Sequence, residues 1–111
     1  VFTLGVNESL DLSGLANAAL VSTIDMASNS SANTVKLTLN DVLNTAITNG
    51  VHSLKLIGTA DDAVDLDMSE WTNTGTTVTE GEHTFVVYNA NATNAAQLLI
   101  DQAMINAGHV M

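Results

Sequence analysis

The chain contains no cysteine, no proline and no arginine, and it sets only two lysines against twelve acidic residues. Without cysteine there is no disulfide, thiolate nucleophile, zinc finger or iron–sulfur centre, so a cysteine-based metal site is excluded. The net charge of −10 argues against nucleic acid as a partner, because phosphate neutralisation needs clustered Lys and Arg. The same deficit of cations argues against electrostatic attachment to an anionic membrane surface.

Long hydrophobic runs are missing as well. No segment reaches the roughly 20 apolar residues of a transmembrane helix, so we do not expect an integral membrane protein. The first residues, VFTLG, place no basic segment ahead of an apolar core, so a Sec-type signal peptide is not expected. The length of 111 residues suits one small domain, and the start at Val1 leads us to expect a piece of a longer protein.

Polar uncharged residues take the place of the missing charges. The chain has 14 Thr, 12 Asn and 8 Ser, whereas only 13% of its residues are charged and 4% are aromatic. Asn, Ser and Thr side chains bond to nearby backbone and compete with helix, so this composition favours short strands joined by turns. An acidic, lysine-poor and cysteine-free composition also favours a secreted bacterial protein.

Apolar alternation predicts a series of short strands and one short helix. Asn40 is a suitable N-cap for a helix that we expect to end at residues 49–50, with Gly50 as its left-handed C-cap. A Thr-rich stretch predicts an exposed hairpin around Gly75 and Gly81, and residues 15–20 suit either a helical turn or a loop. The predicted strands cover residues 2–12, 20–26, 34–39, 51–57, 63–68, 84–88 and 97–101.

These elements predict a mainly β fold with one short helix. Two topologies stay open, a small β-sandwich or roll and a short solenoid-like domain. Apolar segments around Leu10, Ile24, Leu37, Leu56 and Leu66 resemble the rungs of a solenoid but are unevenly spaced, and no fixed repeat is evident.

No catalytic constellation is apparent. His52, His83 and His109 lie in three separate segments, and none forms a metal-ligand pair with a neighbouring His or Glu. There is no G-x-S-x-G nucleophile elbow and no phosphate-binding P-loop. We therefore expect a protein that is not an enzyme.

One acidic segment is a candidate cation site. Calcium is bound by six to eight oxygens, and alternating Asp residues project carboxylates from one face of a strand. The alternative is a solvated turn and edge strand whose charges discourage edge-to-edge pairing. The candidate calcium ligands are Asp61, Asp62, Asp65 and Asp67.

Three segments together resemble the C-terminal region of giant bacterial RTX adhesins, the biofilm-associated proteins that leave the cell by type I secretion. They are TVKLTLNDVLNTA at 34–46, LKLIGTADDAVDLDMSEWTNTGT at 54–76 and HTFVVYNANATNAAQLLIDQAM at 83–104. Such proteins end with an L-T-L-x-D-V-L segment, an L-x-I-x-G-x-x-x-D-x-V-x-L segment, a Trp, a Thr/Gly hairpin and a final L-L-I-D. The chain departs from the family at its calcium repeats, because residues 58–62 are at most one degenerate copy of G-G-x-G-x-D-x-U-x.

The resemblance implies that residues 1–111 form a single, non-catalytic C-terminal β domain of a secreted, cell-surface adhesin. It further implies an uncleaved secretion determinant within 97–111, read by an ABC transporter and its adaptor, and a fold that forms outside the cell with possible help from calcium. The alternative for the same residues is that 98–100 are simply the last core strand. The candidate secretion residues are Leu98, Leu99, Ile100, Ile105, Val110 and Met111.

Two further functions remain open. The domain could be an adhesion module that binds a surface or glycan ligand, which a shallow site holding Trp71 or Tyr88 would favour. Trp71 is otherwise expected to anchor the core. The domain could instead cap an upstream β-solenoid, which predicts an exposed apolar face around Phe2, Leu4 and Leu10.

Overall fold

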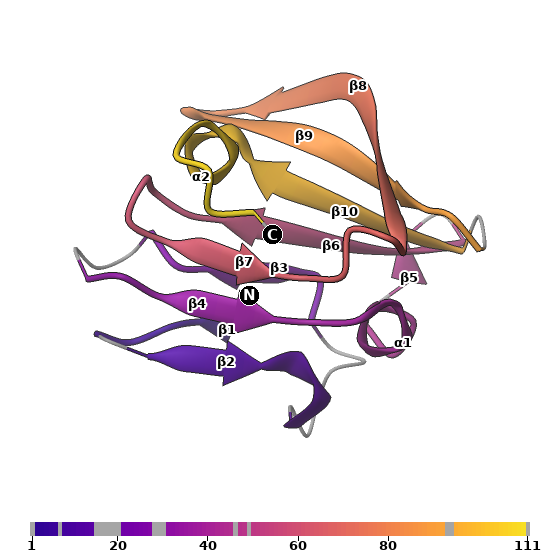
Figure 1. Cartoon of the computed structure of the whole chain (residues 1–111), viewed down its shortest axis with the longest axis horizontal. Coiled ribbons are helices and arrows are strands. Elements are labelled where there is room, and N and C mark those ends of the chain that lie inside the picture. The colour runs from indigo at the N-terminus through magenta and orange to yellow at the C-terminus, as the bar shows by residue number, and fades with distance from the viewer. Residues whose placement is uncertain are drawn as a thin grey trace.

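The chain passes repeatedly between two sheets, so that strands far apart in sequence lie side by side (Figure 1). In the computed structural model, which describes residues 2–6, 8–14, 21–27, 31–45, 47–48, 50–92 and 95–110, the larger sheet is seven-stranded. Its parallel part contains β1 (Phe2–Thr3), β3 (Thr23–Asp25), β6 (Val51–Ile57) and β10 (Ala96–Asp101), side by side in that order. The smaller sheet is parallel throughout and contains β2 (Ser9–Asp11), β4 (Thr34–Lys36) and β7 (Ala63–Asp65).

The chain therefore winds as a roll of four coils. The first coil contains β1 and β2, the second β3 and β4, and the third β6 and β7, with one strand of each pair in each sheet. The fourth coil gives β10 to the larger sheet and an isolated bridge at Val110 to the smaller one. In the larger sheet Phe2 pairs with Ile24, Ile24 with Leu56, and Leu56 with Ile100. In the smaller sheet Leu10 pairs with Val35 and Val35 with Val64, and an isolated parallel bridge adds Val110 beside Val64. This arrangement confirms the prediction of a mainly β domain.

The core lies between the two sheets. Ile24, Leu54, Leu56, Leu98 and Ile100 enter it from the larger sheet, and none of them is exposed. Burial of one such side chain contributes about 1.5–3 kcal/mol, so this stack supplies much of the stability. A smaller apolar cluster lies on the other face of the larger sheet and comprises Phe85, Val87, Leu99, Ile57 and Val78.

An antiparallel hairpin extends the larger sheet beyond β10. It consists of β8 (Trp71–Glu80) and β9 (His83–Ala90), and β9 pairs with β10. Gly81 lies in the turn with φ of 61°, as predicted, but Gly75, with φ of 75°, lies within β8. The register of β8 shifts between Asn73 and Thr77, so of the two glycines of the predicted hairpin only Gly81 lies in its turn, and Gly75 lies at a bulge.

The predicted helix is shorter than expected and begins earlier. α1 (Leu39–Val42) is capped by Thr38 rather than Asn40, because Thr38 and Asp41 form a reciprocal capping box. Residues that were expected to continue the helix instead form β5 (Ile47–Thr48), which pairs with β6. Gly50 has a positive φ of 81° as expected, but it lies between these two strands and does not cap a helix.

A second helix, α2 (Gln102–Asn106), follows β10 directly and was not predicted. Asp101 is its N-cap and accepts from the Ala103 N–H at 3.1 Å. A single 3-10 turn, η1 (Leu12–Gly14), follows β2, and residues 15–20, for which a turn or loop was expected, lie outside the described residues. Within the described part of the chain, no helix is both long and apolar enough to cross a membrane.

Candidate functional site

Polar residues meet at the corner where the chain passes from the larger sheet to the smaller one. In the first coil the carboxylate of Glu8 accepts from the N–H of Gly5 at 2.7 Å, and in the third coil Asp62 accepts from the N–H of Thr59 at 2.8 Å. The two turns are alike. In each, the fourth residue donates its backbone N–H to the carbonyl oxygen of the first residue, and its carboxylate accepts from the N–H of that first residue. We call Glu8, Asn33, Asp62 and His109 the polar corner.

Asn33 joins the two turns of the polar corner. Its side-chain amide donates to the carbonyls of Gly5 and Glu8 at 2.8 and 3.0 Å, and its backbone N–H donates to Asp62 Oδ1 at 2.9 Å. Asn33 and Asp62 are 1% and 0% exposed. His109 adds the fourth coil, with Nδ1 at 3.1 Å from the carbonyl oxygen of Asp62. The corner thus links all four coils through side chains.

The four predicted calcium ligands do not converge. Asp62 is buried and occupied with backbone donors, whereas Asp61, Asp65 and Asp67 are exposed. Among the residues that the structure describes, no three His, Asp or Glu side chains come together as a metal site would require. Calcium binding stays a prediction, with Asp62 as an internal acceptor rather than a free ligand.

Asp67 forms a local turn that recurs in the first coil. It accepts from the Ser69 N–H at 2.9 Å and from the Ser69 hydroxyl at 2.6 Å, and Asp11 makes the same two bonds with Ser13. These bonds hold the pKa of both carboxyls below the ordinary value of 3.8. The sequence does contain the signal, since L-D-L-S at 10–13 and L-D-M-S at 66–69 are a short internal repeat.

The predicted secretion residues are built into the fold. Leu98 and Ile100 are fully buried in the core, and Leu99 is 9% exposed in the cluster on the opposite face. Ile105 and Val110 are half-buried against the core, and Met111 lies outside the described residues. Residues 98–100 are thus part of the last strand of the larger sheet, and their role in secretion stays a prediction.

Each histidine has a nearby partner. His52 Nδ1 lies 2.7 Å from the carbonyl oxygen of Thr45, and His83 Nδ1 lies 2.7 Å from Asp101 Oδ2. Asp101 is itself buried and also accepts from the Gly58 N–H at 3.3 Å. With His109 at the polar corner, the three histidines lie at three different places and form no common site.

The two aromatic residues considered for ligand stacking are buried. Trp71 and Tyr88 are each 3% exposed and belong to the main core, so Trp71 is a core anchor. Burial also raises the pKa of the Tyr88 phenol above its ordinary value of 10. The expected apolar face around the N-terminus is not exposed either, because Leu4 is buried and Phe2 and Leu10 pack against the core.

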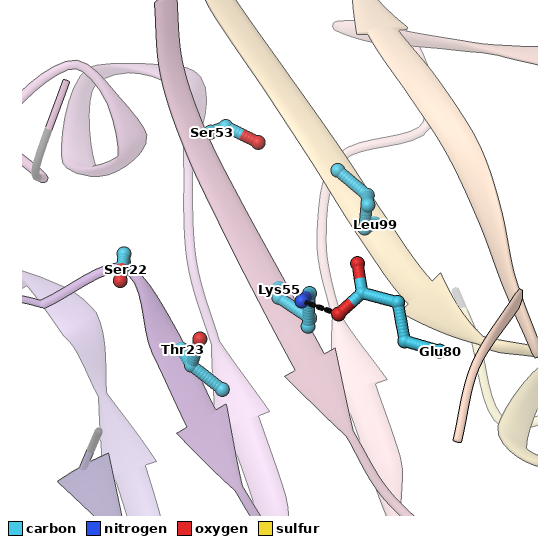
Figure 2. A pocket seen from close by; sticks show the side chains of 6 residues that line it. All are labelled: Ser22, Thr23, Ser53, Lys55, Glu80 and Leu99. Carbon is cyan, nitrogen blue, oxygen red and sulfur yellow. Dashed lines mark hydrogen bonds and ion pairs between the residues drawn. The ribbon is translucent and has the colours of Figure 1, made fainter. Parts of the chain in front are cut away.

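A pocket on the outer face of the larger sheet was not predicted (Figure 2). It has a volume of about 220 Å³, and an ion pair between Lys55 and Glu80 crosses it. Lys55 Nζ also lies 5.5 Å from the centroid of the Phe85 ring. The lining residues come from segments far apart in sequence: Ser22, Thr23, Ser53, Lys55, Glu80 and Leu99.

Comparisons with protein-family models, curated protein sequences and solved structures found no match to this chain.

Proposed function

We propose that this chain is the non-catalytic C-terminal domain of a large RTX-type adhesin, secreted to the bacterial cell surface, and that residues 97–111 carry its type I secretion determinant. The observation that carries the proposal is the parallel two-sheet roll, in which each of the first three coils gives one strand to each sheet. Stacked parallel coils are the architecture built by the calcium-binding repeats of RTX proteins. A domain of this form is suited to follow such repeats.

The three segments that resemble the family coincide with consecutive parts of the roll. The first covers β4 and α1, the second runs from β6 through β7 into β8, and the third spans β9, β10 and the start of α2. The second segment begins within β6 and ends within β8, so the resemblance spans parts of the last two coils and of the hairpin. It supports the proposal through the order of the short motifs along the fold.

The location of β10 connects folding to export. β10 lies between β6 and β9, and the side chains of Leu98 and Ile100 are fully buried. An export machinery that reads these residues must therefore meet the chain before the larger sheet has formed. This fits a transporter and adaptor that act on unfolded chains, and the domain would then fold outside the cell.

The test is export of a reporter fused ahead of residues 1–111, in cells that contain a matching type I exporter. We expect the fusion in the medium, and we expect the same fusion without residues 97–111 to stay in the cells. If the complete fusion stays in the cytosol while the exporter still handles its own substrate, the secretion proposal fails.

A further inference from the structure

The outer-face pocket combines an accessible ion pair with three hydroxyl groups. The side chain of Lys55 is 24% exposed and that of Glu80 is 50% exposed, so both ends of the pair are accessible. Within the described part of the chain, the hydroxyls of Ser22, Thr23 and Ser53 make no hydrogen bond. Such hydroxyls can both donate and accept.

The strands hold these groups at fixed positions. Thr23 pairs with Lys55 and Lys55 pairs with Leu99, so three neighbouring strands present them in one row across the sheet. Figure 2 shows Ser53 on the same strand as Lys55, and it shows the carboxylate of Glu80 directed at the Lys55 ammonium. A site built on strands keeps its geometry better than one built on loops.

Charge favours a neutral ligand. The ammonium of Lys55 is already neutralised by Glu80, and the protein as a whole carries a charge of −10, which repels anions. A cation would compete with Lys55 for Glu80. A neutral polyhydroxyl compound avoids both problems, because one hydroxyl can accept from Lys55 while its neighbour donates to Glu80.

We propose that the outer-face pocket binds one ring of a neutral saccharide, through hydrogen bonds to Lys55, Glu80 and the hydroxyls of Ser22, Thr23 and Ser53. Leu99 provides an apolar contact for the C–H groups of the ring. The volume of about 220 Å³ is below the roughly 300–1,000 Å³ of pockets for drug-sized ligands, which suits a single ring. Leu99 also belongs to the segment proposed for secretion, but saccharide binding is measured on the folded domain and export on the unfolded chain, so either proposal can fail without the other.

The test is an NMR titration of the isotope-labelled 111-residue chain with methyl glycosides of glucose, galactose and mannose. We expect at least one glycoside to give saturable shifts at the amides of residues 22–23, 53–55, 80 and 99, with a Kd on the order of 1 mM. The Thr23→Val/Ser53→Ala variant removes two hydroxyls and leaves the ion pair intact. It should weaken binding roughly tenfold, the loss expected for two hydrogen bonds.

The matched control is Ser9→Ala/Thr34→Val, which makes the same two exchanges on the smaller sheet and should leave the Kd unchanged. Three results would overturn the proposal: no saturable shift at the pocket amides with any glycoside, equal binding by the parent and the pocket variant, or tighter binding of glucuronate than of the methyl glucoside. The spectra themselves show whether each variant is folded.

Discussion

The backbone N–H of Asn33 donates to Oδ1 of Asp62 at 2.9 Å, and both residues are almost completely buried. The bond joins the second coil of the roll to the third across 29 residues of sequence. The other oxygen of the same carboxylate closes the Thr59–Asp62 turn. Asp62 thus satisfies donors of two coils, which makes the polar corner a structural link between them.

Replacement of Asp62 by Ala should therefore be costly. It leaves the buried N–H of Asn33 and the N–H of Thr59 without their acceptor, and we expect a loss of about 2–4 kcal/mol in the free energy of unfolding. Urea denaturation followed by the fluorescence of Trp71 measures this loss. The exposed neighbour provides the control, since Asp61→Ala should change stability by less than about 0.5 kcal/mol. Equal effects of the two variants would show that the corner is not a structural link.

Calcium can be tested on the same domain. The sequence-based hypothesis predicts that calcium raises the Tm more than magnesium does at equal ionic strength, and that Asp61→Ala/Asp65→Ala removes the difference. These two carboxylates are exposed and outside the internal bonds of Asp62, so the double variant should leave the calcium-free Tm nearly unchanged. A Tm of the parent domain that does not respond to calcium would end the hypothesis.

Among the glycines in the described part of the chain, Gly58 is the one where an added Cβ atom would lie closest to another atom. A Cβ there would lie 2.6 Å from Sδ of Met104, a side chain that is fully buried and has little room to move. We expect Gly58→Ala to cost about 1–3 kcal/mol. Gly14→Ala is the matched control, because nothing lies within 4 Å of its Cβ position. If both substitutions are neutral, the side chain of Met104 in α2 does not pack against Gly58.

Tyr88 should titrate at unusually high pH. It is the only tyrosine, so tyrosinate absorbance reports on it alone. Because burial raises its pKa in the folded protein, folding favours the protonated phenol. This contribution to stability is complete below pH 10, the ordinary pKa, and is lost as the pH rises through the folded value. We expect ionisation to coincide with alkaline unfolding, and a normal titration in a still-folded protein would contradict the burial.

The sequence was sufficient to predict strands where the alternation of apolar and polar residues lies within one segment. The alternation in residues 51–57 identifies β6, and that in residues 63–68 identifies β7, although this strand ends at Asp65. Their inward residues Leu54, Leu56 and Val64 are those of the core. The ends of helices were less predictable, because neighbouring residues can each serve as the N-cap. Thr38 and Asp41 together satisfy each other's backbone groups, which Asn40 alone does not do.

Relations between coils could not be predicted. The coils carry insertions of different size, α1 with β5 in one and the β8–β9 hairpin in another, so the spacing between paired residues is irregular. For the same reason Asn33 could not be matched with Asp62, nor Ser53 with Glu80. The pocket is formed by segments that become neighbours only when the sheet has closed.

The most direct test of the proposed function separates the secretion determinant from the core. In the larger sheet Leu98 pairs with Leu54 and Ile100 with Leu56, and all four side chains are fully buried. The variants Leu98→Asp/Ile100→Asp and Leu54→Asp/Leu56→Asp should thus disrupt folding to a similar extent, while only the first changes the proposed determinant.

Both variants are to be compared as reporter fusions in cells with the matching exporter, with export measured as the fraction of reporter in the medium. The proposal predicts that the Leu54/Leu56 variant is exported like the parent, since the machinery accepts unfolded chain, and that export of the Leu98/Ile100 variant is lost. Equal export of the two variants would contradict it.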